Sequence, residues 1–186
     1  IATYGEGELV GVQPYSNPAQ VQKAEGEIST IEALTDHKGL SKAVGVVGLA
    51  RFTPFKNDVL SGEVSDFTAK VDLLTKDMTL QNLINAKAEG ATFGALSDAE
   101  LGLLAESATL INNWRRTKDN GDVYYKTSEK KMTQELDRIA NYRKLDYVIK
   151  GGDPSSVGVQ VTDDGKYWAK NTDGSMTEII RLPDNQ

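Results

Sequence analysis

The spacing of apolar residues changes once along this chain, and that change restricts the folds it can adopt. Between residues 18 and 150, apolar side chains recur at intervals of three and four, the period of an α-helix with one buried face. Beyond the Gly-Gly-Asp-Pro sequence at 151–154 they alternate with polar residues, as at Val157, Val159 and Val161, which is the period of a half-exposed strand. We therefore expect a mainly α fold, an antiparallel helical bundle followed by a small C-terminal antiparallel β meander.

Caps and glycines divide the helical region into segments. Pro18 suits the first turn of a helix, whereas Gly39 and Gly90 are favourable stops. Ser65 and Asp66 predict a further helix start, because both side chains can accept hydrogen bonds from free backbone N–H groups. We expect helices over residues 18–38, 40–47, 65–89 with a break near 77–79, 98–111 and 128–148.

Ser97 and Glu100 form the clearest local signature, that of a capping box. In this motif the serine hydroxyl and the glutamate carboxylate each accept a hydrogen bond from an otherwise unpaired backbone N–H. An apolar stripe follows at helical spacing and predicts the buried face of the helix: Leu101, Leu104, Ala105, Ala108 and Ile111.

Glycine-containing turns organise the rest of the chain. The pair Asn120 and Gly121 predicts a turn before residues 123–125, which we interpret as a short strand or a loop. Turns at 163–165 and 172–175 separate three expected strands near the C-terminus, at 157–161, 167–169 and 179–182. The expected organisation is an irregular, glycine-rich N-terminal arm (1–17), a helical bundle (18–150) and a β meander (151–186).

Composition excludes several classes of protein. The 186 residues carry a net charge of −6, contain no cysteine and contain one histidine. Disulfides, thiolate metal sites and multi-histidine zinc sites are therefore excluded. The acidic balance disfavours a general grip on DNA, which requires clustered lysine and arginine. No apolar run approaches the roughly 18 residues needed to cross a bilayer, so we expect no transmembrane segment.

Few residues are candidates for catalysis. His37 follows Asp36, whose carboxylate could orient an imidazole, but no serine nucleophile motif accompanies it, so we interpret His37 as a surface residue in a turn. A glycoside hydrolase needs two carboxylic acids about 5 to 10 Å apart, for which Glu63, Glu100 and Glu106 are candidates. Capping, helix-dipole and polar-face roles account for these acids and for three others considered: Asp66, Asp72 and Asp98. We therefore predict no catalytic residue.

Two acidic turns, at 119–122 and 171–174, contain oxygen ligands that suit calcium. Neither has the twelve-residue spacing with a terminal glutamate that defines an EF-hand loop. Turn chemistry explains both, and no glycine-rich phosphate-binding motif is present. We therefore predict no metal site and no cofactor.

The compact basic clusters are Trp114-Arg115-Arg116 and Lys130-Lys131. An aromatic ring beside arginines can stack on a nucleotide base. On an acidic chain we instead interpret both clusters as helix-end charges, since lysine and arginine are favourable at helix C-termini. We expect no direct sequence-specific nucleic acid binding.

Two regions resemble a helical module found in virion proteins of tailed bacteriophages. The first is Thr-Ile-Glu-Ala-Leu-Thr-Asp-His-Lys-Gly-Leu-Ser-Lys-Ala-Val-Gly at 30–45. The second combines Ser-Asp-Phe at 65–67, Leu-Gln-Asn-Leu at 80–83, Lys-Ala-Glu-Gly at 87–90 and Gly-Ala-Leu-Ser-Asp-Ala-Glu at 94–100. The chain departs from the module at Lys38, where proline is usual, and residues 112–126 and the β-rich tail lie outside it. The shared positions are caps, stops and core residues, so they carry fold and not catalysis.

The resemblance implies a structural or DNA-ejection component of a phage virion, assembled in the cytoplasm of the bacterial host. We expect a protein that is not an enzyme and that acts through contacts with other copies of itself and with neighbouring virion proteins. Two alternatives remain open at the level of sequence: a cell-wall hydrolase carried by the virion, and an adaptor that binds a host partner through an apolar groove.

Overall fold

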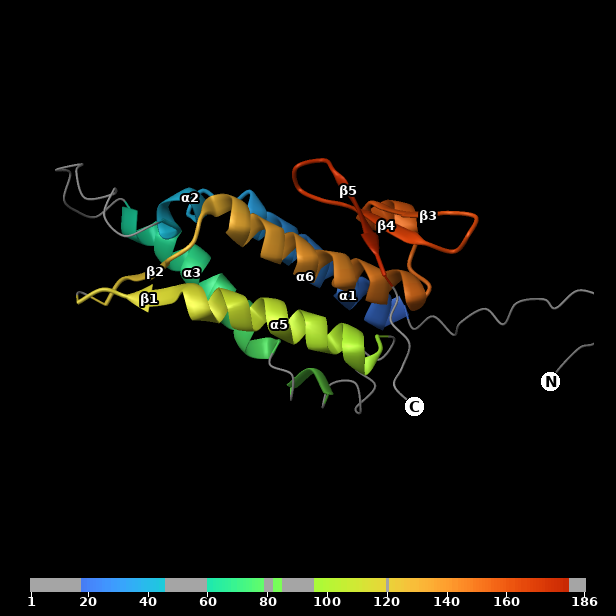
Figure 1. The fold of residues 1–186 in the computed structure, drawn as a ribbon, viewed down its shortest axis with the longest axis horizontal. Helices are drawn as coiled ribbons and strands as arrows, with labels where there is room; N and C mark the ends of the chain where they lie inside the picture. The colour runs from blue at the N-terminus through green and yellow to red at the C-terminus, as the bar shows by residue number, and fades with distance from the viewer. Residues whose placement is uncertain (1–17, 46–59, 79–81, 85–95, 120, 181–186) are drawn as a thin grey trace, which may run out of the picture.

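The computed structural model describes residues 18–45, 60–78, 82–84, 96–119 and 121–180 (Figure 1). The expected arm at 1–17 and the expected stop at Gly90 lie outside these ranges. Within them the chain is mainly helical and ends in a small antiparallel sheet, so the predicted fold class is confirmed. The helices and strands have the following bounds: α1 Pro18–Thr35, α2 Leu40–Ala43, α3 Leu60–Asp77, α5 Asp98–Trp114, β1 Arg115–Thr117, β2 Val123–Tyr125, α6 Glu129–Ile149, the 3-10 helix η2 Pro154–Val157, β3 Val159–Val161, β4 Tyr167–Lys170 and β5 Met176–Ile179.

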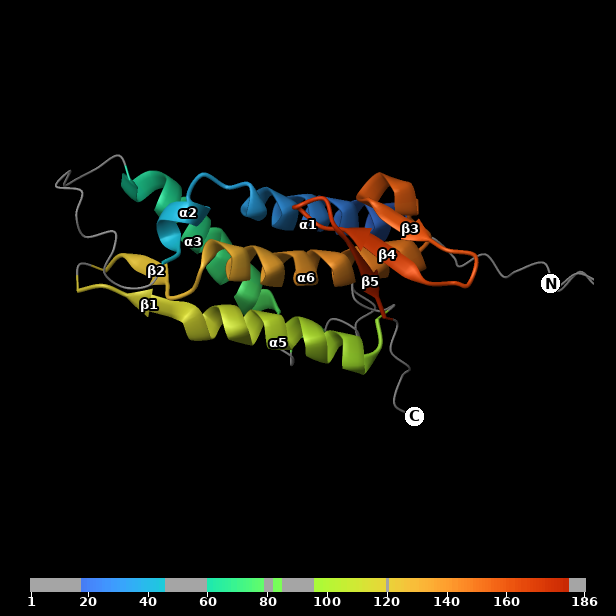
Figure 2. The same cartoon turned by 45° about the horizontal axis from the view of Figure 1, so that its top comes forward.

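Helix α6 is the centre of the bundle. It packs against α1 on one side and α5 on the other, and α3 packs on α5 (Figures 1 and 2). Successive long helices run in alternating directions along the long axis of the molecule. Apolar side chains from all four helices meet in one core, whose fully buried members include Ile31, Leu34, Phe67, Val71, Leu101, Leu104, Ile111, Met132, Leu136 and Ile139.

The strands form two separate antiparallel sheets. Strands β1 and β2 make a hairpin at one end of the bundle, with Arg115 opposite Tyr125. Strands β3, β4 and β5 make a three-stranded meander in that order, which lies against α6 toward the other end (Figure 1). The inward side chains of the meander, Val159, Ala169 and Ile179, join the helical core. The period-two pattern therefore produces one face that is buried against a helix.

The strongest local signals are confirmed. The Ser97 hydroxyl accepts from the backbone N–H of Glu100, and the Glu100 carboxylate accepts from the backbone N–H of Ser97 at 2.8 Å, which completes the capping box. The predicted buried stripe behind it is buried as expected. Ser128 caps α6, and the N–H of Lys118 donates to the Asp122 carbonyl at 2.8 Å where the β1–β2 hairpin turns, with Gly121 at a φ of 88°.

Helix α2 is shorter than predicted. It ends at Ala43 and not at 47, because the next residue, Val44, forms a parallel bridge with Tyr125. The N–H of Gly45 also donates to the Tyr125 carbonyl at 3.1 Å. A long-range contact with β2 therefore ends a helix whose local sequence would continue it.

Helix α3 begins earlier than predicted, at Leu60 and not at the expected Ser65 and Asp66 cap. Its first turns are stabilised by α2, since Lys42 forms an ion pair of 2.6 Å with Glu63. Asp66 lies inside the helix, where it accepts from Lys70 at 2.7 Å. The helix ends at Asp77, within the predicted break.

Three other elements differ from the sequence prediction. Strand β1 was not predicted, because it exists through its pairing with β2 and has little apolar periodicity of its own. Val157 belongs to η2, after Asp153 caps that turn, and not to a strand. Strand β5 covers 176–179 instead of 179–182, because the β4–β5 turn closes where Asn171 donates to the Ser175 carbonyl at 2.8 Å.

Candidate functional site

His37 lies in the turn between α1 and α2 and joins it to α3. Its Nδ1 accepts from the backbone N–H of Gly39 at 3.0 Å, so the ring proton of the neutral imidazole is on Nε2. That Nε2 lies 2.9 Å from the carboxylate of Asp66, and the ring stacks at a tilt on Phe67. Nδ1 therefore fixes the turn and Nε2 joins it to α3. The turn position agrees with the sequence interpretation, but the side chain is only 17% exposed and is not the surface group that was expected.

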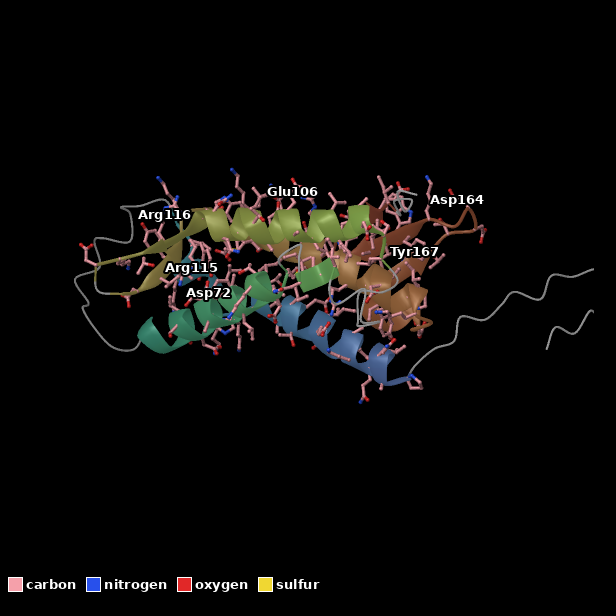
Figure 3. The ribbon with its side chains drawn as sticks, turned by 90° about the horizontal axis from the view of Figure 1, so that it is seen from below. Asp72, Glu106, Arg115, Arg116, Asp164 and Tyr167 are labelled. Atoms are coloured by element: carbon pink, nitrogen blue, oxygen red, sulfur yellow. The ribbon has the colours of Figure 1, made fainter. Side chains whose placement is uncertain are left out.

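The candidate acids do not form a pair. Glu63 binds Lys42, which holds the pKa of its carboxyl below the usual value. Glu100 is buried in the capping box, and Glu106 lies exposed on the outer side of α5, 3.6 Å from Arg138 (Figure 3). Each acid thus has a separate basic or backbone partner on a different part of the bundle. A glycoside hydrolase needs two acids on opposite sides of one bond.

The acidic turns bind their own backbone. In the β4–β5 turn the Asp173 carboxylate accepts from the backbone N–H and the hydroxyl of Ser175, which lowers its pKa. Gly174 has a φ of 82°, as the turn requires. In the β1–β2 turn, Gly121 donates to the Lys118 carbonyl at 2.9 Å. Among the residues that the structure describes, no three acidic or histidine side chains come close enough to hold a metal ion.

The two basic clusters have different positions. Arg116 donates to the carbonyls of Asn113 and Arg115 at the end of α5, which confirms the helix-end interpretation for that residue. Lys130 and Lys131 instead lie in the first turn of α6 and are exposed to water. They are helix-end charges at the start of the helix predicted over 128–148, so the preference of basic residues for helix C-termini does not explain their position.

Arg115 forms an ion pair between the hairpin and the bundle that the sequence analysis did not predict. Its Nε and one terminal nitrogen donate to the Asp72 carboxylate at 2.8 and 2.9 Å, a bidentate arrangement (Figure 3). The Tyr125 hydroxyl donates to the same carboxylate at 3.1 Å. Burial raises the pKa of the Tyr125 hydroxyl, and the Asp72 charge raises it further. The group joins α3 to both strands of the hairpin.

A row of charged residues on α6 is buried, and sequence reasoning missed it too. Arg143 forms an ion pair with Glu27 of α1, and Asp146 lies 2.8 Å from Lys150. Lys144 lies 2.7 Å from Glu32 of α1 and donates to the Lys170 carbonyl of β4 at 2.9 Å, so one cation joins three elements. The contacts of Arg143 and Lys144 thus connect α6 with α1 and β4, although desolvation offsets much of the attraction in a buried ion pair.

Several large apolar side chains remain in water. Leu73 of α3 is 61% exposed and borders an apolar hollow of about 250 Å³ between α1 and α3, whose walls include Ile31 and Met78. The other exposed large apolar residues are Ile84, Val161, Met176 and Ile180. The described surface therefore offers apolar contact points on both the bundle and the meander.

None of the described helices combines the length and the apolar character that crossing a membrane requires. Comparison with known proteins gives no match among family models, curated proteins or solved structures. The function proposed below therefore rests on the residues and their geometry, and no match supports the resemblance to a phage module that the sequence suggested.

Proposed function

We propose that this chain is a non-enzymatic structural component of a bacteriophage virion, an internal, ejection or head-to-tail protein that acts through subunit contacts. The observation that carries the proposal is that the polar candidate residues bond within the fold, while large apolar side chains are exposed. The histidine and acids that could act as catalysts hold elements together, whereas large apolar groups such as Leu73 lie in water. Exposed apolar groups beside a hollow are typical of surfaces that bind other proteins.

The architecture supports the same proposal. Long helices joined by buried ion pairs and by Arg115 form a rigid spacer, with the hairpin and the meander placed toward opposite ends (Figure 1). The net charge of −6 suits a protein that lies near DNA without clamping it, since a DNA clamp needs a basic face. In such a particle the chain would contact other copies and neighbouring virion proteins.

The test has two parts. Light scattering of the purified chain over a wide concentration range is expected to show a multimer, and mass spectrometry of purified particles is expected to detect the chain. Leu73→Asp is expected to weaken self-association, because it places a charge at the exposed edge of the apolar hollow between α1 and α3. Ser65→Asp adds the same charge to an exposed position of the same helix and serves as the control. A chain that stays monomeric and is absent from particles would overturn the proposal.

A peptidoglycan zymogram separates this proposal from a cell-wall hydrolase. We expect no clearing by the wild-type chain. If clearing occurs and is lost in Glu63→Gln, Glu100→Gln or Glu106→Gln, the chain is a hydrolase and the structural proposal fails.

A further inference from the structure

A polar groove runs between α6 and the outer side of β5. Its volume is about 590 Å³. Helix α6 contributes one wall, and the β4–β5 turn with strand β5 contributes the other. No residue of β4 lines it, so the groove lies on the side of β5 that faces away from the rest of the meander. The polar side chains that line it include Glu135, Asp137, Asn141, Asp173 and Glu178.

On the side of β5 that faces this groove, the backbone groups have no partner among the described residues. Lys170 donates to the Gly158 carbonyl and Thr162 donates to the Lys166 carbonyl, so alternate residues of β4 bond toward β3. The residues between them bond toward β5, where their partners are Thr177 and Ile179. Alternation then directs the backbone N–H and C=O groups of Met176 and Glu178 away from β4. Strand β5 is the edge of its sheet, and no described strand covers these groups.

Two buried acceptors in the groove wall lack a hydrogen-bond donor among the described residues. Asn141 is only 6% exposed; its amide nitrogen donates to Asn171 at 2.9 Å, while its Oδ1 has no partner. The Oε2 of Glu135 has no hydrogen bond either, since Arg138 lies 3.8 Å away. Buried acceptors normally have donors, so this wall is suited to a ligand that brings N–H groups.

The charge of the groove defines the kind of ligand. Its lining contains four carboxylates, from Glu135, Asp137, Asp173 and Glu178, and one guanidinium, from Arg138. Lys166 lies near the rim, 3.5 Å from Glu178. Pairing of β5 with β5 of a second copy would bring Glu178 and its neighbouring acids against the same acids, which is unfavourable. A basic strand would meet opposite charges instead.

We propose that this groove binds an extended segment of a partner protein that carries lysine or arginine and adds to β5 as a fourth strand. The backbone of the segment would pair with Met176 and Glu178, and its cationic side chains would donate toward Glu135 and Asn141. Four residues of β5 give room for a segment of about five residues, since a strand rises about 3.3 Å per residue. The inference deepens the proposed function and rests on it for the biological partner, because an assembly module acts through such contacts.

Fluorescence anisotropy with labelled peptides tests the groove directly. The probe is a heptapeptide that alternates lysine with valine; one control replaces each lysine by glutamate, and a second places proline at the centre. The basic peptide is expected to bind the full chain, and both controls are expected to bind at least about tenfold more weakly, because one reverses the charge and the other removes a backbone donor. Equal binding of the proline peptide would overturn strand addition.

Two variants locate the binding. Glu178→Lys is expected to weaken binding of the basic peptide about tenfold, whereas Glu25→Lys, the same change on an exposed residue of α1 outside the groove, is expected to change that binding less than about twofold. Met176→Pro removes an outward N–H and is expected to abolish binding, while Met176→Leu retains it. Equal effects of the two lysine variants would overturn the assignment to this groove, whether or not the proline variant folds.

Hydrogen exchange distinguishes strand addition from binding by charge alone. The amides of Met176 and Glu178 are expected to become protected when the basic peptide is added, and unchanged exchange there would contradict strand addition. The outcome is independent of the particle test. Failure of peptide binding with the chain present in virions overturns the groove alone, whereas binding by a chain absent from virions overturns the proposed function alone.

Discussion

Gly39, the residue before α2, lies directly against α3. Its φ of −77° is ordinary, so space and not conformation requires glycine. A Cβ at this position would overlap the backbone carbonyl of Glu63 and lie 2.9 Å from the Cβ of Phe67. Gly39→Ala is therefore expected to lower the free energy of unfolding by about 2 to 3 kcal/mol, since helix backbones must separate to admit the methyl group. Urea unfolding followed by circular dichroism measures this change.

Gly26→Ala is the matched control for that prediction. Gly26 lies inside α1, and nothing is within 4 Å of a Cβ built there. Alanine should stabilise the helix by about 0.5 to 1 kcal/mol through its lower backbone entropy in the unfolded chain. If the two substitutions change stability by the same amount and sign, close packing is not what Gly39 provides.

The buried hydroxyl of Tyr125 should make the folded protein less stable at alkaline pH. Burial raises the pKa of its hydroxyl, so above about pH 10 the unfolded chain loses a proton that the folded chain keeps. Stability from this group is complete below pH 10 and falls by about 1.4 kcal/mol per pH unit above it. Near pH 8, Tyr125→Phe should lower the free energy of unfolding by about 1 kcal/mol, because the hydrogen bond to Asp72 is lost. About one unit above pH 10, the variant and the wild type should have equal free energies of unfolding. A difference between the two proteins that stays constant from pH 8 to 11 would contradict the prediction.

At the scale of elements, the position of the hairpin depends on Arg115. Arg115 and Asp72 are each 36% exposed, so solvent screens the pair and we expect a coupling of about 0.5 to 1 kcal/mol. A double-mutant cycle with Arg115→Lys and Asp72→Asn measures this coupling, because lysine cannot form the bidentate contact. Arg116→Lys is the control, since Arg116 bonds only carbonyls at the end of its own helix in the described contacts. A coupling of zero would show that the hairpin is held by its apolar contacts alone.

Elements defined by neighbouring residues were predictable from sequence. The capping box of Ser97 and Glu100 satisfies backbone groups within one turn, and α5 begins where that motif predicts. The elements that sequence reasoning misplaced depend on distant partners: α2 stops where Val44 meets Tyr125, and β1 forms by pairing with β2. Propensity carries no information about such partners.

The candidate site was less predictable than the fold for the same reason. Asp72 and Arg115 are 43 positions apart, and neither has a local pattern that announces the other. Lys144 looks like a solvent-facing position of a polar helix, yet Glu32 and the Lys170 carbonyl surround it. The alternation in 159–179 did predict the meander, but only the register assigns the outward backbone groups to Met176 and Glu178.

At the scale of the whole molecule, the meander depends on the bundle. A three-stranded sheet of this size is marginal alone, and its buried face is completed by α6. Polar contacts reinforce the junction: Lys144 reaches the Lys170 carbonyl, and the backbone N–H and hydroxyl of Thr172 donate to Asp137. The bundle and the meander should therefore unfold together, although the spacing of apolar residues in the sequence differs between them.

The two tryptophans make this testable, because Trp114 ends α5 in the bundle and Trp168 lies in β4 of the meander. In Trp168→Phe only the bundle reports by fluorescence, and in Trp114→Phe only the meander does. With Lys144→Met added to each, both unfolding midpoints should fall together, by about 1 to 2 kcal/mol in free energy, since the Lys170 carbonyl loses its donor. Lys131→Met, at an exposed position of the same helix, should leave both midpoints in place. If only the Trp168 signal shifts, the meander unfolds before the bundle, and cooperativity between the two parts, which the contacts with α6 imply, is absent.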